Sequence, residues 1–132
     1  FMYDPVTGTL AFPLVENSGV GKQFNGLAVY DLDRKRGFTN KGRIDHGALA
    51  EVFIEQQCET MKQQNPASST YYCSPQYRGQ LRMQYPVSRS MIVDNYILSL
   101  SQIGLEIHEL GDLDVAATLS WAKVQKKAAI AQ

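Results

Sequence analysis

The chain has 132 residues, 44% of them hydrophobic, so it is long enough to bury a core and predicts a single domain over 1–132. Thirteen basic and thirteen acidic side chains cancel, which excludes a global electrostatic field that would hold the protein on nucleic acid or on an anionic membrane. No apolar run reaches membrane-spanning length, so the given chain predicts no membrane span. Because the sequence begins with Phe rather than Met, we expect a processed or excised segment.

The first third of the chain predicts a small antiparallel β element. Residues 4–8, Asp-Pro-Val-Thr-Gly, form a turn signal between two short apolar segments, 1–3 and 9–14. Pro13 places the second of these strands toward a sheet edge, since proline has no N–H to donate. The compact apolar run 27–30 predicts a further strand.

The segment after this run is basic. Its cations crowd into a short connection that contains glycine, a pattern that could bind phosphates or an acidic protein surface. Acidic residues flank the cluster and partly neutralise it, so a solvated surface is the leading interpretation and nucleic-acid contact an alternative. The candidate residues are Arg34, Lys35, Arg36, Lys41 and Arg43.

An amphipathic helix is predicted over about 46–64. Apolar residues from Ala50 to Met61 recur at steps of four and three, which keeps them on one helical face. Asp45 offers an N-cap for this helix. Pro66 ends it, because the residue before a proline is driven out of the α conformation.

The segment that follows predicts a loop and then one more strand. Prolines and serines punctuate residues 66–77, and apolar residues alternate with polar ones over 81–85. Tyr71 and Tyr72 add amphipathic surface of the kind that is favoured at interfaces. These two tyrosines therefore join the five cations as candidate interaction residues.

The two cysteines, Cys58 and Cys73, predict one disulfide. Closing a loop of this length restricts the unfolded chain by about 3 kcal/mol. The disulfide predicts an extracellular, periplasmic or virion location, because such bonds persist in oxidising compartments. Two free thiols in the cytoplasm are the alternative.

The C-terminal third predicts a helical hairpin over about 89–110 and 113–130. From Ile92 to Leu110, apolar residues recur at steps of four and three, and Gly111 follows as a helix-ending residue. The predicted fold is therefore α+β, with the small N-terminal antiparallel β element packed against the 46–64 helix and this helical hairpin.

The same residues also fit a β-hairpin over 103–124 that follows a shorter helix. Apolar and polar residues alternate through much of this segment. Its two apolar sets share a face only if Ile107 lies opposite Ala117 and Leu105 opposite Leu119. That pairing requires a loop with an odd number of residues.

No catalytic residue, cofactor or metal site is predicted. Nucleophilic catalysis needs a nucleophile, a base and a group that orients the base, and nothing in the sequence brings His46 or His108 next to Cys58 or Cys73. The same four residues lack the close paired spacing of zinc modules.

The sequence therefore predicts a non-enzymatic structural or interaction subunit of a larger assembly, such as an exported appendage, an envelope machine or a virion shell. A molecule without net charge repels its copies only weakly, so we expect copies of itself or other protein subunits as partners. The alternatives are a small enzyme or redox protein that uses Cys and His, and local nucleic-acid contact through residues 34–43.

Overall fold

A computed structural model of the protein describes residues 1–121, which form two four-stranded antiparallel sheets and three helices. In each sheet every strand pairs with the next one along the chain, and the helices stand between the two sheets in chain order. The N-terminal sheet contains β1 (Met2–Asp4), β2 (Thr9–Asn17), β3 (Gln23–Asp33) and β4 (Gly37–Asp45). The helices are α1 (Gly47–Gln64), α2 (Pro66–Tyr72) and α3 (Pro75–Gln84), and the C-terminal sheet contains β5 (Arg89–Val93), β6 (Tyr96–Ser101), β7 (Gly104–Glu109) and β8 (Val115–Ser120).

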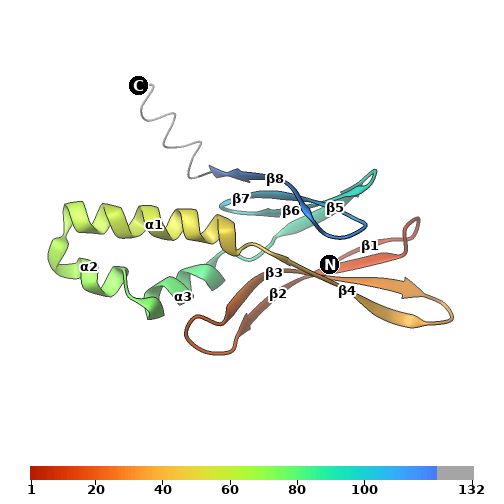
Figure 1. Cartoon of the computed structure of the whole chain (residues 1–132), viewed down its shortest axis with the longest axis horizontal. Coiled ribbons are helices and arrows are strands. Elements are labelled where there is room, and N and C mark those ends of the chain that lie inside the picture. The colour runs from red at the N-terminus through yellow and green to blue at the C-terminus, as the bar shows by residue number, and fades with distance from the viewer. Residues whose placement is uncertain (122–132) are drawn as a thin grey trace, which may run out of the picture.

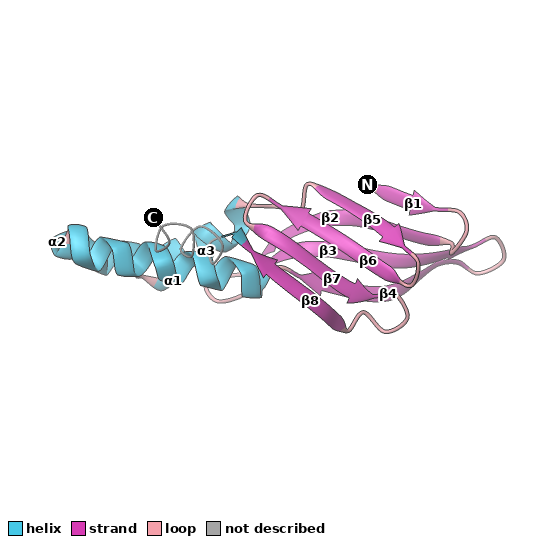
Figure 2. Ribbon diagram, turned by 90° about the horizontal axis from the view of Figure 1, so that it is seen from above, coloured by secondary structure: helices cyan, strands magenta, loops and turns pink. Residues whose placement is uncertain are grey.

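The two sheets lie face to face, and the three helices extend together from one end of them (Figures 1 and 2). Residues two apart on a strand share a face, so each sheet contributes every second side chain to the space between them. One buried cluster fills that space and draws on both sheets: Ala11, Leu27, Val29, Ile44, Val87, Ile97 and Leu110.

The N-terminal sheet confirms that the first third of the chain is antiparallel β structure, but it is larger than predicted. The basic segment that the sequence predicted as a connection is a short turn followed by β4. Asp33 closes this turn, because its Oδ1 accepts the backbone N–H groups of Lys35 at 2.7 Å and Arg36 at 3.0 Å. Gly37 then takes the left-handed conformation, with φ of 73°, that most other residues avoid.

Pro13 lies where β2 is a sheet edge. The short β1 pairs only with residues 9–11, so beyond Ala11 one side of β2 has no neighbouring strand among residues 1–121. Pro13 pairs with Leu27 on the other side. Such edge positions tolerate proline.

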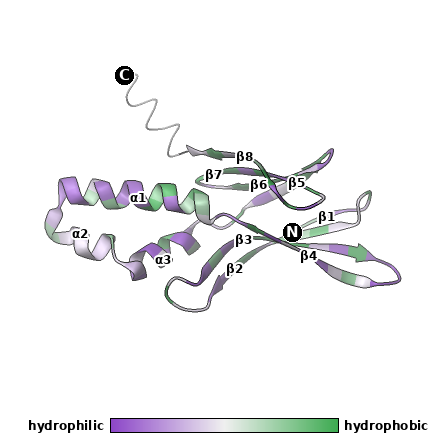
Figure 3. Ribbon diagram, in the orientation of Figure 1, coloured by the Kyte–Doolittle hydropathy of each residue, from purple (hydrophilic) through white to green (hydrophobic). Residues whose placement is uncertain are grey.

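The helix predicted over 46–64 is α1. Its buried side chains fall on one face and meet α3 and the β6–β7 turn in a second core cluster, formed by Leu49, Ala50, Ile54, Leu81 and Ile103. The half of α1 nearest the sheets is the more apolar half (Figure 3). Among residues 1–121, no helix has both the length and the hydropathy that crossing a membrane requires.

The loop predicted over 66–77 and the strand predicted over 81–85 are wrong, because α2 and α3 occupy these residues. Pro66 and Pro75 each stand in the first turn of a helix, where no backbone N–H is needed. Ser74 caps α3 by accepting the N–H of Tyr77 at 3.3 Å. The prolines that suggested loop structure are therefore helix starts.

The helical hairpin predicted over 89–110 and 113–130 is also wrong. Residues 89–109 form β5, β6 and β7, and 115–120 form β8; the remainder of the second predicted helix, from residue 122, lies outside the described residues. A two-residue turn at Asp94 and Asn95 breaks the first predicted helix, with Asp94 at a φ of 51°. Asn95 also accepts the backbone N–H of Leu110 at 2.7 Å, which ties this turn to the end of β7.

The alternative prediction, a β-hairpin over 103–124, gave the correct register for β7 and β8. Leu105 lies opposite Leu119 and Ile107 opposite Ala117, on either side of the five-residue loop 110–114. The shorter helix expected before this hairpin is absent from the described residues, because β5 and β6 precede it.

Candidate functional site

The predicted disulfide between Cys58 and Cys73 is present and ties α1 to the end of α2. The Cα atoms of the two residues are 5.1 Å apart, and Cys58 is buried. We call α1, α2 and α3 together the helical arm. Because both cysteines are oxidised, neither offers a thiolate for nucleophilic or redox catalysis in this state.

The two candidate tyrosines lie in a three-ring cluster on the helical arm. Tyr71 and Tyr72 have ring centroids 5.3 Å apart, and Tyr77 of α3 packs against both, at 5.3 Å from Tyr71 and 4.9 Å from Tyr72. Burial raises the pKa of Tyr77. Sequence reasoning missed Tyr77, because it assigned no structure that would bring residue 77 back to the pair.

Ion pairs connect α1 and α3 within the helical arm. Arg78 of α3 pairs with Glu55 and lies 3.9 Å from Glu51. Arg82 Nε donates to Glu51 Oε1 at 2.6 Å. In the helical arm a disulfide therefore links α1 to the end of α2, and ion pairs link α1 to α3.

The five candidate cations do not form one patch. Lys41 lies 3.7 Å from Asp31, and Arg43 donates two hydrogen bonds to Glu16, at 2.9 and 3.1 Å. The hydrogen bond from Arg43 holds the pKa of the Glu16 carboxyl below its usual range. The other three cations are exposed and lie on the β3–β4 turn: Arg34, Lys35 and Arg36.

A buried polar cluster joins the two sheets. His46 follows β4, and its Nε2 lies 2.7 Å from the hydroxyl of Ser99 on β6. Glu106 pairs with Ser99 across the β6–β7 ladder, and His108 follows two residues later on the same face. All four side chains are buried, with 0 to 3% of their surface exposed, and we call them the polar joint.

Burial determines the charge state of the polar joint. It raises the pKa of Glu106 to about 7, with a smaller contribution from the nearby charge of Asp45. Burial also lowers the pKa of His46 to about 4, with a contribution from His108, and it lowers the pKa of His108 itself. Near neutral pH both imidazoles are therefore uncharged, although Glu106 Oε2 and His108 Nε2 are only 3.7 Å apart.

Several polar atoms of the joint have no hydrogen-bond partner within the described part of the chain. They are His46 Nδ1, Glu106 Oε2 and His108 Nδ1. The helix predicted over 89–110 includes His108, whereas this residue lies on β7 with its side chain buried. The alternation of Glu106 and His108 with Leu105 and Ile107 was the signal for a strand with one polar and one apolar face.

The face of the C-terminal sheet that points away from the N-terminal sheet is apolar. We call it the outer face. Cross-strand rows run over it, one joining Leu100, Leu105 and Leu119 and another joining Met91, Leu98, Ile107 and Ala117. Within the described structure Met91 remains 55% exposed and Leu119 45% exposed, so this face has no complete cover.

The N-terminal sheet also presents apolar side chains on the face opposite its core residues. Phe12 and Tyr30 lie side by side there with ring centroids 5.6 Å apart, and Phe38 meets Tyr30 edge-on at 6.5 Å. Phe38 is 65% exposed. This face is aromatic, whereas the outer face of the C-terminal sheet is aliphatic.

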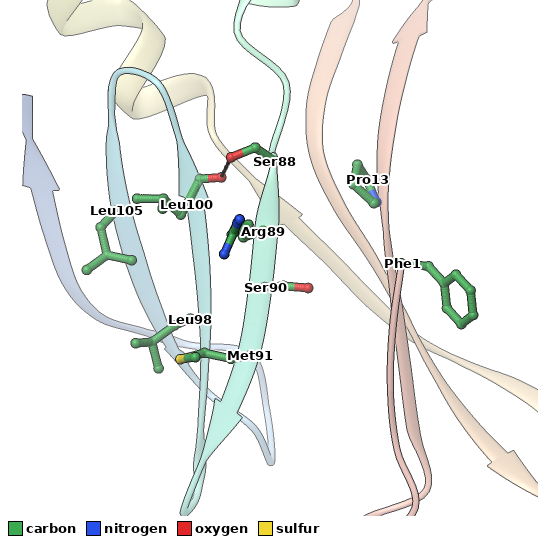
Figure 4. A pocket seen from close by; sticks show the side chains of 9 residues that line it. All are labelled: Phe1, Pro13, Ser88, Arg89, Ser90, Met91, Leu98, Leu100 and Leu105. Carbon is green, nitrogen blue, oxygen red and sulfur yellow. Dashed lines mark hydrogen bonds between the residues drawn. The ribbon is translucent and has the colours of Figure 1, made fainter.

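A cavity of about 390 Å³ lies along β5, beside the segments that carry Phe1 and Pro13. Figure 4 shows Ser90 directed toward those segments and Leu98 on the opposite side of β5. The nine lining residues are mostly apolar and include Arg89, but none of them is a His, Cys, Asp or Glu. The cavity therefore lacks a side chain of the kinds that usually act as general base or metal ligand.

One group of carboxylates among residues 1–121 could offer ligand atoms to a cation. Glu109 at the end of β7 and Asp112 and Asp114 on the β7–β8 loop are exposed, with their ligand atoms within 4.8 Å of one another. Asp112 Oδ1 already accepts the backbone N–H of Asp114 at 2.9 Å. Exposed acidic loops commonly form such groupings without a metal, so we assign no site here.

Comparison with known proteins gives one match. A family model described as "Beta propeller domain" matches residues 1–113, which span the N-terminal sheet, the helical arm and the C-terminal sheet as far as the β7–β8 loop. No curated protein and no solved structure matches the chain.

Proposed function

The chain belongs to the beta propeller domain family, and we propose that it acts as a non-enzymatic interaction domain whose two sheets are blades of a larger assembly. A propeller blade is a four-stranded sheet, and a propeller closes with four to eight blades around a central channel. Both sheets have the four consecutive antiparallel strands of a blade. Two blades cannot close a ring, so other sheets must complete it.

The outer face of the C-terminal sheet, which residues 1–121 leave partly exposed, is the observation that carries this proposal. The contact between the two sheets supports it, because one sheet covers the other through the buried cluster that includes Val29, Ile44 and Ile97. Leu98, Leu105 and their row neighbours repeat that apolar surface on the other side of the same sheet. Contiguous apolar surface of this kind marks an interaction site.

The occupant that fits this face is a further four-stranded sheet with an apolar face. An aliphatic, strand-spaced surface packs well against side chains that repeat with the same period, at the sheet separation of about 10 Å. A chain with no net charge offers little electrostatic resistance to such packing. Another copy of this chain or a different protein subunit could supply that sheet.

We place this assembly outside the cytoplasm, in an exported appendage or an envelope machine. The disulfide between Cys58 and Cys73 supports an oxidising location. The third predicted setting, a virion shell, gains no separate support from the described residues.

Two facts about the described residues support a non-enzymatic role. The cysteines form a disulfide, and the imidazoles of His46 and His108 are buried in the polar joint, away from the cavity along β5. Neither histidine therefore lies next to a nucleophile that faces a ligand-sized space.

The test measures the native mass of the protein by sedimentation and compares two double variants. Met91→Lys with Leu119→Lys places two cations on the outer face at positions that are already 55% and 45% exposed, so folding is expected to survive. We expect this variant to weaken association at least ten-fold, because each charge must be desolvated when a sheet packs over it.

The matched control is Val6→Lys with Val20→Lys. It adds the same charge at exposed apolar residues on turns, which lie away from the outer face. We expect this variant to associate like the natural protein. A mass that is a multiple of one chain identifies copies as the partner, and a heavier complex with a second polypeptide identifies another subunit. A natural protein that stays monomeric in its native extract, with the same mass for both variants, would overturn the proposal.

A further inference from the structure

Glu106 is a buried carboxyl group between the two sheets, and no lysine or arginine among residues 1–121 pairs with it. Only 2% of its surface is exposed, and its Oε2 has no hydrogen-bond partner. Among residues 1–121, the histidine His108 is the only basic side chain that comes within ion-pair distance, at 3.7 Å. That imidazole is itself buried, and its Nδ1 lacks the acceptor that a charged imidazole would need.

The other titratable groups around the joint do not compensate a charge on Glu106. Asp45, at the end of β4, is acidic and acts against ionisation of Glu106. His46, between β4 and α1, already uses Nε2 on Ser99. Across the ladders on either side of Glu106 stand Ser99 of β6 and Thr118 of β8, which carry no charge.

We propose that the polar joint is a pH-sensitive switch: loss of the Glu106 proton to solvent leaves an unpaired charge between the sheets, and the packing of the C-terminal sheet on the N-terminal sheet loosens. A buried charge without a partner destabilises the closed arrangement strongly. The open arrangement relieves this by letting water reach the carboxylate.

The direction of the effect follows from proton linkage. The closed state holds the Glu106 proton more tightly than an open, solvated state does, since the pKa is about 7 when the group is buried and 4.5 otherwise. The contribution of Glu106 to the stability of the closed arrangement is therefore fully present below about pH 4.5. It is lost as pH rises from there through about 7. Slightly alkaline conditions open the joint.

Opening would also change the assembly, a consequence that rests on the proposed function. The joint lies between the two sheets, so its opening would change the angle between them and the direction in which their outward apolar faces point. Rising pH would then weaken the interaction of this domain with its neighbouring sheets.

The test is amide hydrogen exchange on the whole chain between pH 6 and pH 8, corrected for the intrinsic pH dependence of exchange and run at a concentration where the chain is monomeric. We expect the protection of β6 and β7 amides to fall by about ten-fold over this range, because the solvated carboxylate of the open state is already ionised while the closed state keeps its proton up to about pH 7, and the effect levels off above that pH. Glu106→Gln, which cannot ionise, should keep its protection throughout. The control Glu109→Gln removes an exposed carboxylate on the same strand and should follow the natural protein.

A second variant covers the case in which Glu106→Gln does not fold. Asp45→Asn removes the acidic neighbour and keeps a side-chain oxygen for the N–H of Gly47. It should lower the pKa of Glu106, so the midpoint of the loss of amide protection should move to lower pH. A natural protein whose corrected protection is flat from pH 6 to 8 would overturn the switch, as would an unchanged profile in a folded Glu106→Gln. Because the chain is monomeric in this experiment, either result is independent of whether the assembly forms.

Discussion

The imidazole of His46 lies 2.7 Å from the hydroxyl of Ser99, and this contact joins two sheets that are separated by the whole helical arm in the sequence. Both residues are fully buried, with 1% and 0% of their surface exposed. We expect Ser99→Ala to lower the free energy of unfolding by about 1–3 kcal/mol, because His46 Nε2 would be left buried without a partner. Urea denaturation measures this change.

The control for that substitution is Ser88→Ala. The Ser88 hydroxyl donates to the carbonyl of Leu100 at 3.1 Å, but it is exposed, so water can replace the bond. Its loss should cost less than about 0.5 kcal/mol. Equal costs for the two serine variants would show that the His46 contact contributes nothing specific.

Gly26→Ala should destabilise the N-terminal sheet. A Cβ at this position would come within 1.8 Å of the backbone oxygen of Ile44, so β3 and β4 would have to separate. Such overpacking typically costs about 1–3 kcal/mol. Gly111→Ala is the comparison, because a Cβ there meets nothing within 4 Å, and thermal unfolding of the two variants should differ by several degrees. A Gly26→Ala protein as stable as Gly111→Ala would contradict the close approach of these strands.

Reduction of the disulfide should lower stability by about 3 kcal/mol, the value expected for a closed loop of about 15 residues. Cys58 and Cys73 are 15 positions apart. The change appears as a lower urea midpoint in the presence of reductant. A Cys58→Ala, Cys73→Ala protein should match the reduced protein and should not respond to reductant, and an unchanged midpoint for the natural chain would contradict a stabilising disulfide.

Acid should destabilise the protein through His46. Its pKa is lowered from 6.5 to about 4 by burial, so the folded protein holds a neutral imidazole while the unfolded chain protonates. The contribution of His46 is fully present above pH 6.5 and is lost as pH falls through about 4, to a total of up to about 3 kcal/mol. Because Glu106 has the opposite dependence, unfolding midpoints of the natural protein should decline only below about pH 4.5, and the loss from His46 at higher pH is measured by comparison with a His46 variant.

His46→Gln is the variant that isolates the acid effect. It removes the titrating group and keeps a side chain that can bond to Ser99, so its loss of stability on acidification should be smaller than that of the natural protein. Together with the opposite dependence of Glu106, the natural protein should be most stable between about pH 5 and 6. A decline of the same steepness in the variant would assign the acid sensitivity to other groups.

Some parts of the fold followed from short stretches of sequence. The helix over 46–64 has an uninterrupted apolar stripe and a proline just beyond its end, and both signals are local. The first strands lie on either side of a strong turn signal at residues 4–8. Two cysteines permit only one internal pairing, so Cys58 and Cys73 needed no structure to be matched.

The C-terminal third was misread because one set of residues satisfies two periods. Ile92, Leu100 and Ile107 fit the spacing of a helical stripe, yet in the sheet Ile92 shares the inner face with Ile97, and Leu100 and Ile107 point the other way. The Asp94–Asn95 turn was the local signal that favoured strands, and it was overlooked. The sheet prevails because it pairs backbone groups across four strands and buries one face of them against the N-terminal sheet.

The sequence by itself determined the elements whose signals lie within about twenty neighbouring residues: the amphipathic α1 helix, the first antiparallel strands and the single cysteine pair. Only the tertiary structure decided that residues 89–120 form a second sheet, that Tyr77 joins Tyr71, and that His46 and Glu106 meet Ser99 between the sheets. The physical reason is that these contacts join residues far apart in the chain, and their energy comes from burial against another sheet or helix rather than from any local preference.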